Sequence, residues 1–155
     1  MSAKYINCCL KKIAKKFNQL MNDSPKFKES EKKIEVIMSI LSNYTPECIV
    51  ESSLECKIGD LGDIDSISSK EFAFRFKDAF DIADIDINRA VTHNKGIMNG
   101  VDAVLISTGN DFRAVEAGVH AFASSKGKYK SLSECSIIDN IFKISLKIPL
   151  SIGTV

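Results

Sequence analysis

A strict two-residue alternation over residues 49–58 is the feature that most constrains the fold of this chain. Apolar or small side chains occupy every second position, and polar side chains lie between them (Val50, Ser52, Leu54, Cys56 and Ile58 against Glu51, Ser53, Glu55 and Lys57). Successive side chains of a strand point to opposite faces, so the alternation predicts a strand with one buried face.

Other segments have the three- and four-residue apolar spacing of amphipathic helices. This spacing predicts four helices: one over residues 5–21, a second with Glu71 in its first turn and its buried stripe over residues 72–83, and two more over residues 96–107 and 112–124. Ser68 or Ser69 is expected to cap the second helix, because a hydroxyl at that position can accept from a free backbone N–H of the first turn.

Two more strands are expected to form a hairpin within residues 131–155, around Asp139-Asn140, and residues 34–41 are predicted to form another strand. Strands and helices therefore follow one another in mixed order, without regular β-α-β alternation. This order indicates an α+β fold with mixed helices and antiparallel strands.

The composition limits the classes of partner. The 21 basic and 20 acidic residues nearly cancel, so no general attraction to nucleic acid or to a membrane surface is expected. The five cysteines follow no metal-ligand spacing and are expected to be reduced thiols of a cytoplasmic protein (Cys8, Cys9, Cys48, Cys56 and Cys135). No stretch approaches the ~20 apolar residues that span a bilayer.

One charged cluster lies on the first predicted helix, where four lysines share a face (Lys11, Lys12, Lys15 and Lys16). A solvated helix face is the commoner outcome for such a cluster. Binding of a polyanion is the alternative.

Lys95 and Asp111 stand at the two ends of a short apolar run. A lysine ammonium suits the stabilisation of a developing oxyanion, and a nearby carboxylate would keep it protonated. Gly96 and Gly100 would let a ligand approach the backbone closely. The alternative is a solvated lysine in a turn over residues 94–96, with Asp111 as a helix cap; residue types alone favour this alternative.

The stretch from Arg89 to Asp111 resembles the catalytic-lysine region of the class II (bacterial) 3-hydroxy-3-methylglutaryl-CoA reductases. In that family Arg-Ala-x-Thr-His-Asn-Lys-Gly-Ile-x-Asn-Gly is followed, after Asp-Ala-Val, by Ala-Thr-Gly-Asn-Asp, and this chain differs by Ser107 in place of the alanine. The similarity continues through residues 112–123 and 127–132, and more loosely covers residues 34–43 and 149–155.

The resemblance implies reduction of hydroxymethylglutaryl-CoA to mevalonate and CoA in two hydride transfers from NADPH or NADH. It implies that Lys95 is the catalytic lysine and that Asp111 is the aspartate hydrogen-bonded to it. Arg89 resembles the arginine that holds the free carboxylate of the substrate, for which a guanidinium is well suited. Thr92 and Asn99 are expected to line the same pocket.

Two parts of the family machinery have no clear counterpart here. The catalytic glutamate and histidine of the family match no position of this sequence, and His93 and His120 are expected to be structural. The cofactor motif Asp-Ala-Met-Gly-x-Asn aligns only in its second half, with Ser2 for glycine and Lys4 for asparagine. Ser2 and Lys4 are thus the remnant of a cofactor-binding motif.

The resemblance also predicts how the chain is organised. Residues 1–45 are expected to be the end of the small cofactor-binding domain, and residues 46–155 part of the large substrate-binding domain. The expected function is that of a truncated, dimer-based reductase with little activity alone; the alternative is a noncatalytic remnant that pairs with another subunit. Exposed strand edges predict weak stability or association.

Overall fold

The computed structural model describes residues 3–28 and 35–153, which divide into two compact units between Ser42 and Asn43. The first unit contains α1 (Ala3–Asp23) and α2 (Pro25–Lys28). The second contains a three-stranded sheet, a short 3-10 helix η1 (Ile58–Leu61), and three helices, α3 (Ser69–Ile85), α4 (Ile87–Ser107) and α5 (Phe112–Ala123). Which domains of the reductase family these units represent stays a prediction.

The first unit confirms the helix predicted for residues 5–21 and contradicts one strand. The four clustered lysines of α1 are exposed, and so are several residues of its apolar face (Ile13, Phe17 and Leu20). The strand predicted for residues 34–41 is wrong for its described part, because residues 35–41 form neither helix nor strand. An apolar, β-branched run becomes a strand only where a partner strand supplies hydrogen bonds, and the sheet of the described residues includes no pairing with residues 35–41.

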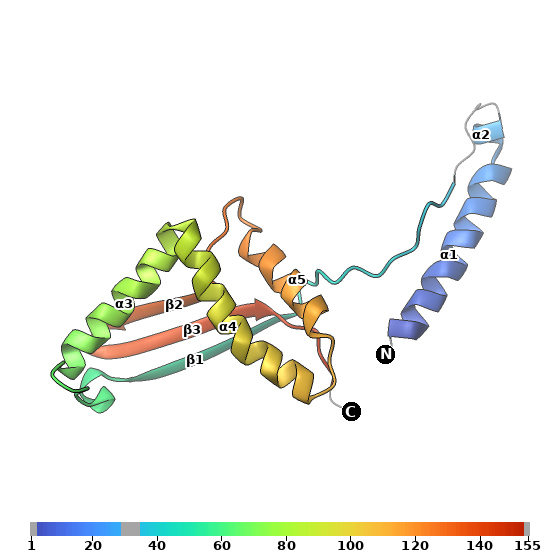
Figure 1. Cartoon of the computed structure of the whole chain (residues 1–155). Coiled ribbons are helices and arrows are strands. Elements are labelled where there is room, and N and C mark those ends of the chain that lie inside the picture. The colour runs from blue at the N-terminus through green and yellow to red at the C-terminus, as the bar shows by residue number, and fades with distance from the viewer. Residues whose placement is uncertain (1–2, 29–34, 154–155) are drawn as a thin grey trace. The chain divides into compact units, whose positions relative to one another are not determined.

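The sheet of the second unit consists of β1 (Ile49–Lys57), β2 (Ser133–Ile138) and β3 (Ile141–Pro149) in the antiparallel order β1-β3-β2 (Figure 1). The hairpin predicted around Asp139-Asn140 is confirmed. These two residues connect β2 to β3 with φ angles of 49° and 65°. A two-residue turn with both φ values positive matches the right-handed twist of the strands that it joins, and Asn and Asp tolerate this conformation.

The two faces of the sheet differ as the alternation predicted. On one face Cys135, Phe142 and Ile148 are buried beneath the three helices of the second unit, α3, α4 and α5, which lie on that side of the sheet (Figure 1). On the other face Glu51 pairs with Lys147 and Glu55 with Lys143, each at 3.8 Å.

The predicted burial of β1 is wrong, although its alternation is confirmed. Val50 and Leu54 lie on the same face as Ile148 and Ile144, yet their exposed fractions are 45% and 66%. The reason is the position of β1 at the edge of the sheet: α3 packs on β2 and α5 packs on β3, so the helical layer stops short of β1.

The helices begin at side-chain caps. The Ser68 hydroxyl accepts from the backbone N–H of Glu71 and begins α3, as predicted. The carboxylate of Asp86 accepts from the N–H groups of Asn88 and Arg89 and begins α4 at Ile87, upstream of the predicted start at Gly96. A short acidic residue satisfies two N–H groups that would otherwise lack partners, so the chain turns directly from α3 into α4.

The fold class is α+β, as the sequence predicts. Within the described residues, no helix is long and apolar enough to cross a membrane, and no cluster of three His, Cys, Asp or Glu side chains is arranged to hold a metal ion.

Candidate functional site

Helix α4 carries most of the predicted site residues, and its periodicity sorts them onto one side. A rotation of about 100° per residue places Arg89, Thr92, Lys95 and Asn99 within one half of the helix circumference. Thr92, Lys95 and Asn99 are exposed, and Arg89 is half-buried. The turn alternative for residues 94–96 is therefore wrong, because these residues lie inside a continuous helix of 21 residues.

Two glycines, Gly96 and Gly100, lie on the same side of α4 as these polar residues and leave open space there. A Cβ atom added at Gly96 or Gly100 would meet nothing within 4 Å. Glycine is unfavourable by about 1 kcal/mol relative to alanine inside a helix. Nothing in the packing of the described residues compensates this cost, so the two glycines fit the expectation of a close approach by another molecule.

The opposite side of α4 holds the fold together. Asn94 is fully buried; its side-chain amide donates to the carbonyl oxygen of Lys130 at 2.9 Å and accepts from the N–H of Leu132 at 3.0 Å. The two bonds fix the segment that leads into β2. The structure therefore uses Asn94 within the core, although this residue directly precedes Lys95 in the sequence.

Both histidines have partners inside the fold, as predicted for structural residues. His93 Nε2 lies 2.8 Å from the Ser133 hydroxyl, and its ring packs edge-on against Phe80. His120 Nδ1 lies 2.8 Å from the Tyr129 hydroxyl. Burial is the main cause that lowers the pKa of His93, and the positive charge of Arg89 adds to it. His93 is therefore favoured in its neutral form, in which one ring nitrogen can accept.

The predicted cationic groups of the exposed face remain unpaired within the described part of the chain. The ammonium of Lys95, the guanidinium of Arg89 and the amide of Asn99 make no side-chain hydrogen bond or ion pair with residues 3–28 or 35–153. The Thr92 hydroxyl donates back to the carbonyl oxygen of Asn88 at 3.1 Å. Two cations and an amide are thus available to an anionic ligand.

Asp111 lies at the N-terminus of α5 and caps it. Its carboxylate accepts from the N–H of Ala114 and from Arg113 Nε, both at 3.4 Å. The alternative of a helix cap is confirmed for this residue. This capping role is compatible with a second role of Asp111, because its side chain stays exposed.

Within one chain the structure keeps Lys95 and Asp111 apart. Helices α4 and α5 run antiparallel: Met98 and Val119 belong to one buried cluster, and burial together with the nearby charge of Asp102 raises the pKa of Glu116, which places Asp102 beside Glu116. Asp111 therefore lies beside the C-terminal end of α4, which is 12 residues beyond Lys95. At 1.5 Å per residue this separation is about 18 Å along the helix, too far for a hydrogen bond.

The predicted cofactor remnant is not assembled into a site in the described structure. Ser2 lies outside the described residues, and Lys4 is an exposed residue in the first turn of α1. A hollow in the first unit is lined by later residues of α1 and by Val36, Met38 and Ser39, without Lys4. These residues therefore do not form a dinucleotide pocket by themselves.

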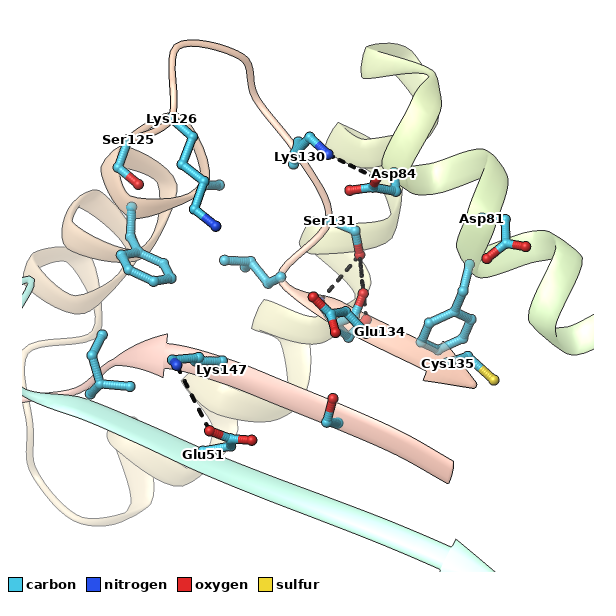
Figure 2. A pocket seen from close by; sticks show the side chains of 17 residues that line it. Glu51, Asp81, Asp84, Ser125, Lys126, Lys130, Ser131, Glu134, Cys135 and Lys147 are labelled. Atoms are coloured by element: carbon cyan, nitrogen blue, oxygen red, sulfur yellow. Dashed lines mark hydrogen bonds and ion pairs between the residues drawn. The ribbon is translucent and has the colours of Figure 1, made fainter. Parts of the chain in front are cut away.

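A hollow of about 780 Å³ in the second unit contains none of the predicted site residues (Figure 2). It opens over the outer face of the sheet, between the C-terminal end of α3 and the loop that follows α5. Lys130 pairs with Asp84 at 2.8 Å at its rim, and Lys147 pairs with Glu51 across its floor. Its lining comes from five separate parts of the chain, with six consecutive residues (130–135) as the largest contribution, so no single sequence motif predicts this hollow.

Comparisons with known proteins agree on one family. The family model described as hydroxymethylglutaryl-coenzyme A reductase matches residues 1–155. A probable 3-hydroxy-3-methylglutaryl-coenzyme A reductase of Borreliella burgdorferi is 54% identical over 66 residues, which cover 43% of this chain and 15% of that protein. The Archaeoglobus fulgidus reductase is 42% identical over 95 residues, covering 60% of this chain and 21% of that protein.

Solved structures give the same result. A reductase from Streptococcus pneumoniae superposes with a TM-score of 0.68 and 41% identity, over 73% of this chain and 27% of that one. Another structure of the Streptococcus pneumoniae enzyme, described as class II and bound to NADPH in open conformations, has the same TM-score and identity over 31% of its length. This chain therefore matches about a sixth to a third of each relative.

Proposed function

The chain belongs to the hydroxymethylglutaryl-coenzyme A reductase family, and we propose from this premise that it carries the substrate-binding face of a class II reductase. The proposed reaction is the reduction of hydroxymethylglutaryl-CoA to mevalonate and CoA by NADPH or NADH in the cytoplasm. One observation carries the proposal: Arg89, Thr92, Lys95 and Asn99 share one side of α4, and its two cations have no partner among the described residues.

The spacing of the two cations suits a short acyl chain with a charge at one end. Arg89 and Lys95 are six positions apart, about 9 Å along the helix axis. The planar guanidinium of Arg89 can hold the free carboxylate through two parallel hydrogen bonds. Lys95, as a compact point charge, then lies beside the thioester carbonyl oxygen, where negative charge develops when hydride arrives.

The remaining polar residues have supporting roles in the proposed site. The Asn99 amide lies one turn beyond Lys95 and can hydrogen-bond the substrate hydroxyl or carbonyl group. Thr92 lies between Arg89 and Asn99 on the exposed side and contributes its methyl group, since its hydroxyl already donates to Asn88. Gly96 and Gly100 leave room for the acyl chain to lie against the helix.

Asp111 completes this site only in a larger assembly. Lys95 and Asp111 of one chain are about 18 Å apart along α4. In this proposal the carboxylate that contacts Lys95 therefore comes from Asp111 of a second subunit or from another segment of the longer enzyme. A carboxylate at that position would favour the charged form of Lys95. The dinucleotide would likewise be held outside the described residues, since Lys4 lines no hollow.

The proposal is tested by transferring α4, α5 and the following loop, residues 87–130, into the full-length Borreliella burgdorferi relative. The chimera is expected to oxidise mevalonate in the presence of CoA and NAD(P)⁺. Lys95→Ala in the chimera should lower kcat by roughly 10²–10³-fold, the cost of removing one preorganised oxyanion donor. Lys126→Ala, which removes an exposed lysine at the separate hollow, is the matched control. An active chimera that is indifferent to Lys95→Ala would contradict the assigned role.

A noncatalytic role as a pairing module is a second proposal, favoured by the unpartnered apolar side chains of β1. Co-purification of this chain with a full-length relative supports it. A chain that remains monomeric in that mixture contradicts it.

A further inference from the structure

We propose that two copies of this chain associate through the free edge of β1, as antiparallel strands with Leu54 of each copy at the twofold axis. This inference concerns the edge of strand β1, a surface separate from the exposed side of α4. It therefore goes beyond the proposed reductase function. The association would join two three-stranded sheets into one continuous sheet.

The backbone of β1 identifies which groups are free. The N–H of Ile58 donates to the carbonyl oxygen of Asn140 at 3.0 Å, and the carbonyl oxygen of Cys48 accepts from Leu150 at 2.8 Å. In an antiparallel ladder alternate residues bond to alternate sides, so the even-numbered residues of β1 bond toward β3. The odd-numbered residues Glu51, Ser53, Glu55 and Lys57 direct their N–H and C=O groups to the edge, where no described strand pairs.

Apolar side chains along this edge are also exposed to solvent. Val50 and Leu54 lie on the face that carries the core elsewhere in the sheet, yet they are 45% and 66% exposed. A long edge strand with exposed apolar residues is a template for pairing with another strand. No proline or bulge within Ile49–Lys57 blocks such pairing, because the register with β3 is unbroken over all nine residues.

Charge and the length of the overlap together select the register of a self-paired β1. With Leu54 at the axis, Glu51 of each copy lies opposite Lys57 of the second copy, and Ser53 lies opposite Glu55. With Ser53 at the axis, Glu51 would lie opposite Glu55, and with Glu55 at the axis that residue would face itself. Directly opposed like charges destabilise a strand pair, whereas opposite charges stabilise it. With Cys56 at the axis, Glu55 would also lie opposite Lys57, but only residues 55–57 of the strand would pair.

The neighbouring strand reinforces the chosen register. Glu51 already lies 3.8 Å from Lys147 of its own chain, so in the paired state its carboxylate lies between two lysines. Lys57 has no ion pair with any residue in the described ranges and is free to take this partner. The two Leu54 residues form a non-hydrogen-bonded pair, in which the side chains come closest.

The oligomeric state of the whole chain, measured by sedimentation velocity over a concentration series, tests the interface. The unmodified chain is expected to dimerise reversibly. Glu51→Lys or Lys57→Glu alone places like charges at two symmetric positions and should weaken dimerisation by roughly tenfold. The exchange of both, Glu51→Lys with Lys57→Glu, should restore it.

Glu55→Lys is the matched control. Glu55 has the same 3.8 Å contact with a β3 lysine as Glu51, but it faces a serine in the proposed register. Its substitution should leave the dimer intact. Far-UV circular dichroism checks that each variant keeps its fold.

A disulfide test reports the register directly. Cα atoms of a non-hydrogen-bonded pair lie ~4.5 Å apart, which is within reach of a disulfide. Leu54→Cys should therefore give a linked dimer whose bridge maps by peptide mass to position 54 of both copies, and Ser53→Cys should not bridge to itself. A monomer at all concentrations, a dimer indifferent to Glu51→Lys, or a bridge from Ser53→Cys in place of Leu54→Cys would each overturn the proposal.

Discussion

Two asparagines on the same helix allow a test of whether one side of α4 stabilises the core while the other side is exposed. Asn94 and Asn99 are one and a half turns apart, yet one is fully buried and the other exposed. We expect Asn94→Ala to destabilise the second unit strongly and Asn99→Ala to leave its stability almost unchanged. The comparison holds residue type and helix constant, so only the side of the helix differs.

The magnitude follows from the two hydrogen bonds of Asn94. Its removal deletes a bond to the carbonyl of Lys130 and one from the N–H of Leu132. Each net hydrogen bond contributes about 1 kcal/mol, and a buried backbone group left without a partner costs about 1–3 kcal/mol. Higher helix propensity of alanine offsets roughly 0.5 kcal/mol. The expected loss is therefore roughly 3 kcal/mol, a large part of the ~5–15 kcal/mol that stabilises a domain.

The assay is urea unfolding followed by circular dichroism, with linear extrapolation to water. Amide hydrogen exchange at Leu132 should accelerate in Asn94→Ala, because that N–H loses its acceptor. For Asn99→Ala the free energy of unfolding should change by less than about 0.5 kcal/mol, the usual range for exposed positions. A loss below about 1 kcal/mol for Asn94→Ala, or an equal loss for Asn99→Ala, would refute the assignment of the two faces.

Three further changes probe other features of the fold. Gly118→Ala should lower the free energy of unfolding by about 1–3 kcal/mol, because the new Cβ would lie 2.8 Å from the carbonyl oxygen of Asn43. Gly100→Ala, where the new Cβ would meet no atom within 4 Å, should raise it by up to ~1 kcal/mol. Equal effects of the two substitutions in urea unfolding would contradict this contrast. Burial lowers the pKa of His93 in the folded state, so the unfolded chain binds the proton more readily. The free energy of unfolding should therefore be insensitive to His93 above the ordinary histidine pKa of ~6.5 and should fall as the pH drops below it. His93→Gln should reduce this pH dependence in urea unfolding. Asn140→Gly should raise the melting temperature, since φ is 65° there, and Asn140→Val should lower it; a melting temperature that is the same in both variants would show that the turn conformation is unimportant.

Local patterns were sufficient to predict elements whose partners are close in sequence. The hairpin at Asp139-Asn140 and the cap at Ser68 depend on a few neighbouring residues, and both are confirmed. The burial of Val50 and the strand predicted at residues 34–41 depend on what lies beside them in space; the first prediction was wrong, and the second was wrong for its described part, residues 35–41. Periodicity states which residues share a face, but it does not state whether a second layer covers that face.

The same limit applies to the candidate site. Sequence identified Lys95 and Arg89 through family resemblance, and helix geometry then placed them on one side of α4. It did not predict that Asn94 belongs to the core, because an asparagine between His93 and Lys95 has the residue type of a ligand group. Only the positions of Lys130 and Leu132, which are 36 and 38 residues away, reveal its role.

The continuity of α4 has a consequence for how this segment can evolve. A substitution changes one side chain, but a single inserted or deleted residue between Arg89 and Leu105 rotates everything beyond it by about 100°. Such a change would turn Met98 and Leu105 toward solvent and carry charged or polar groups into the core. A point mutation on the outer side of the helix therefore leaves the fold intact even where it alters the proposed site, whereas the length of the helix between Asp86 and Thr108 should be invariant in functional descendants.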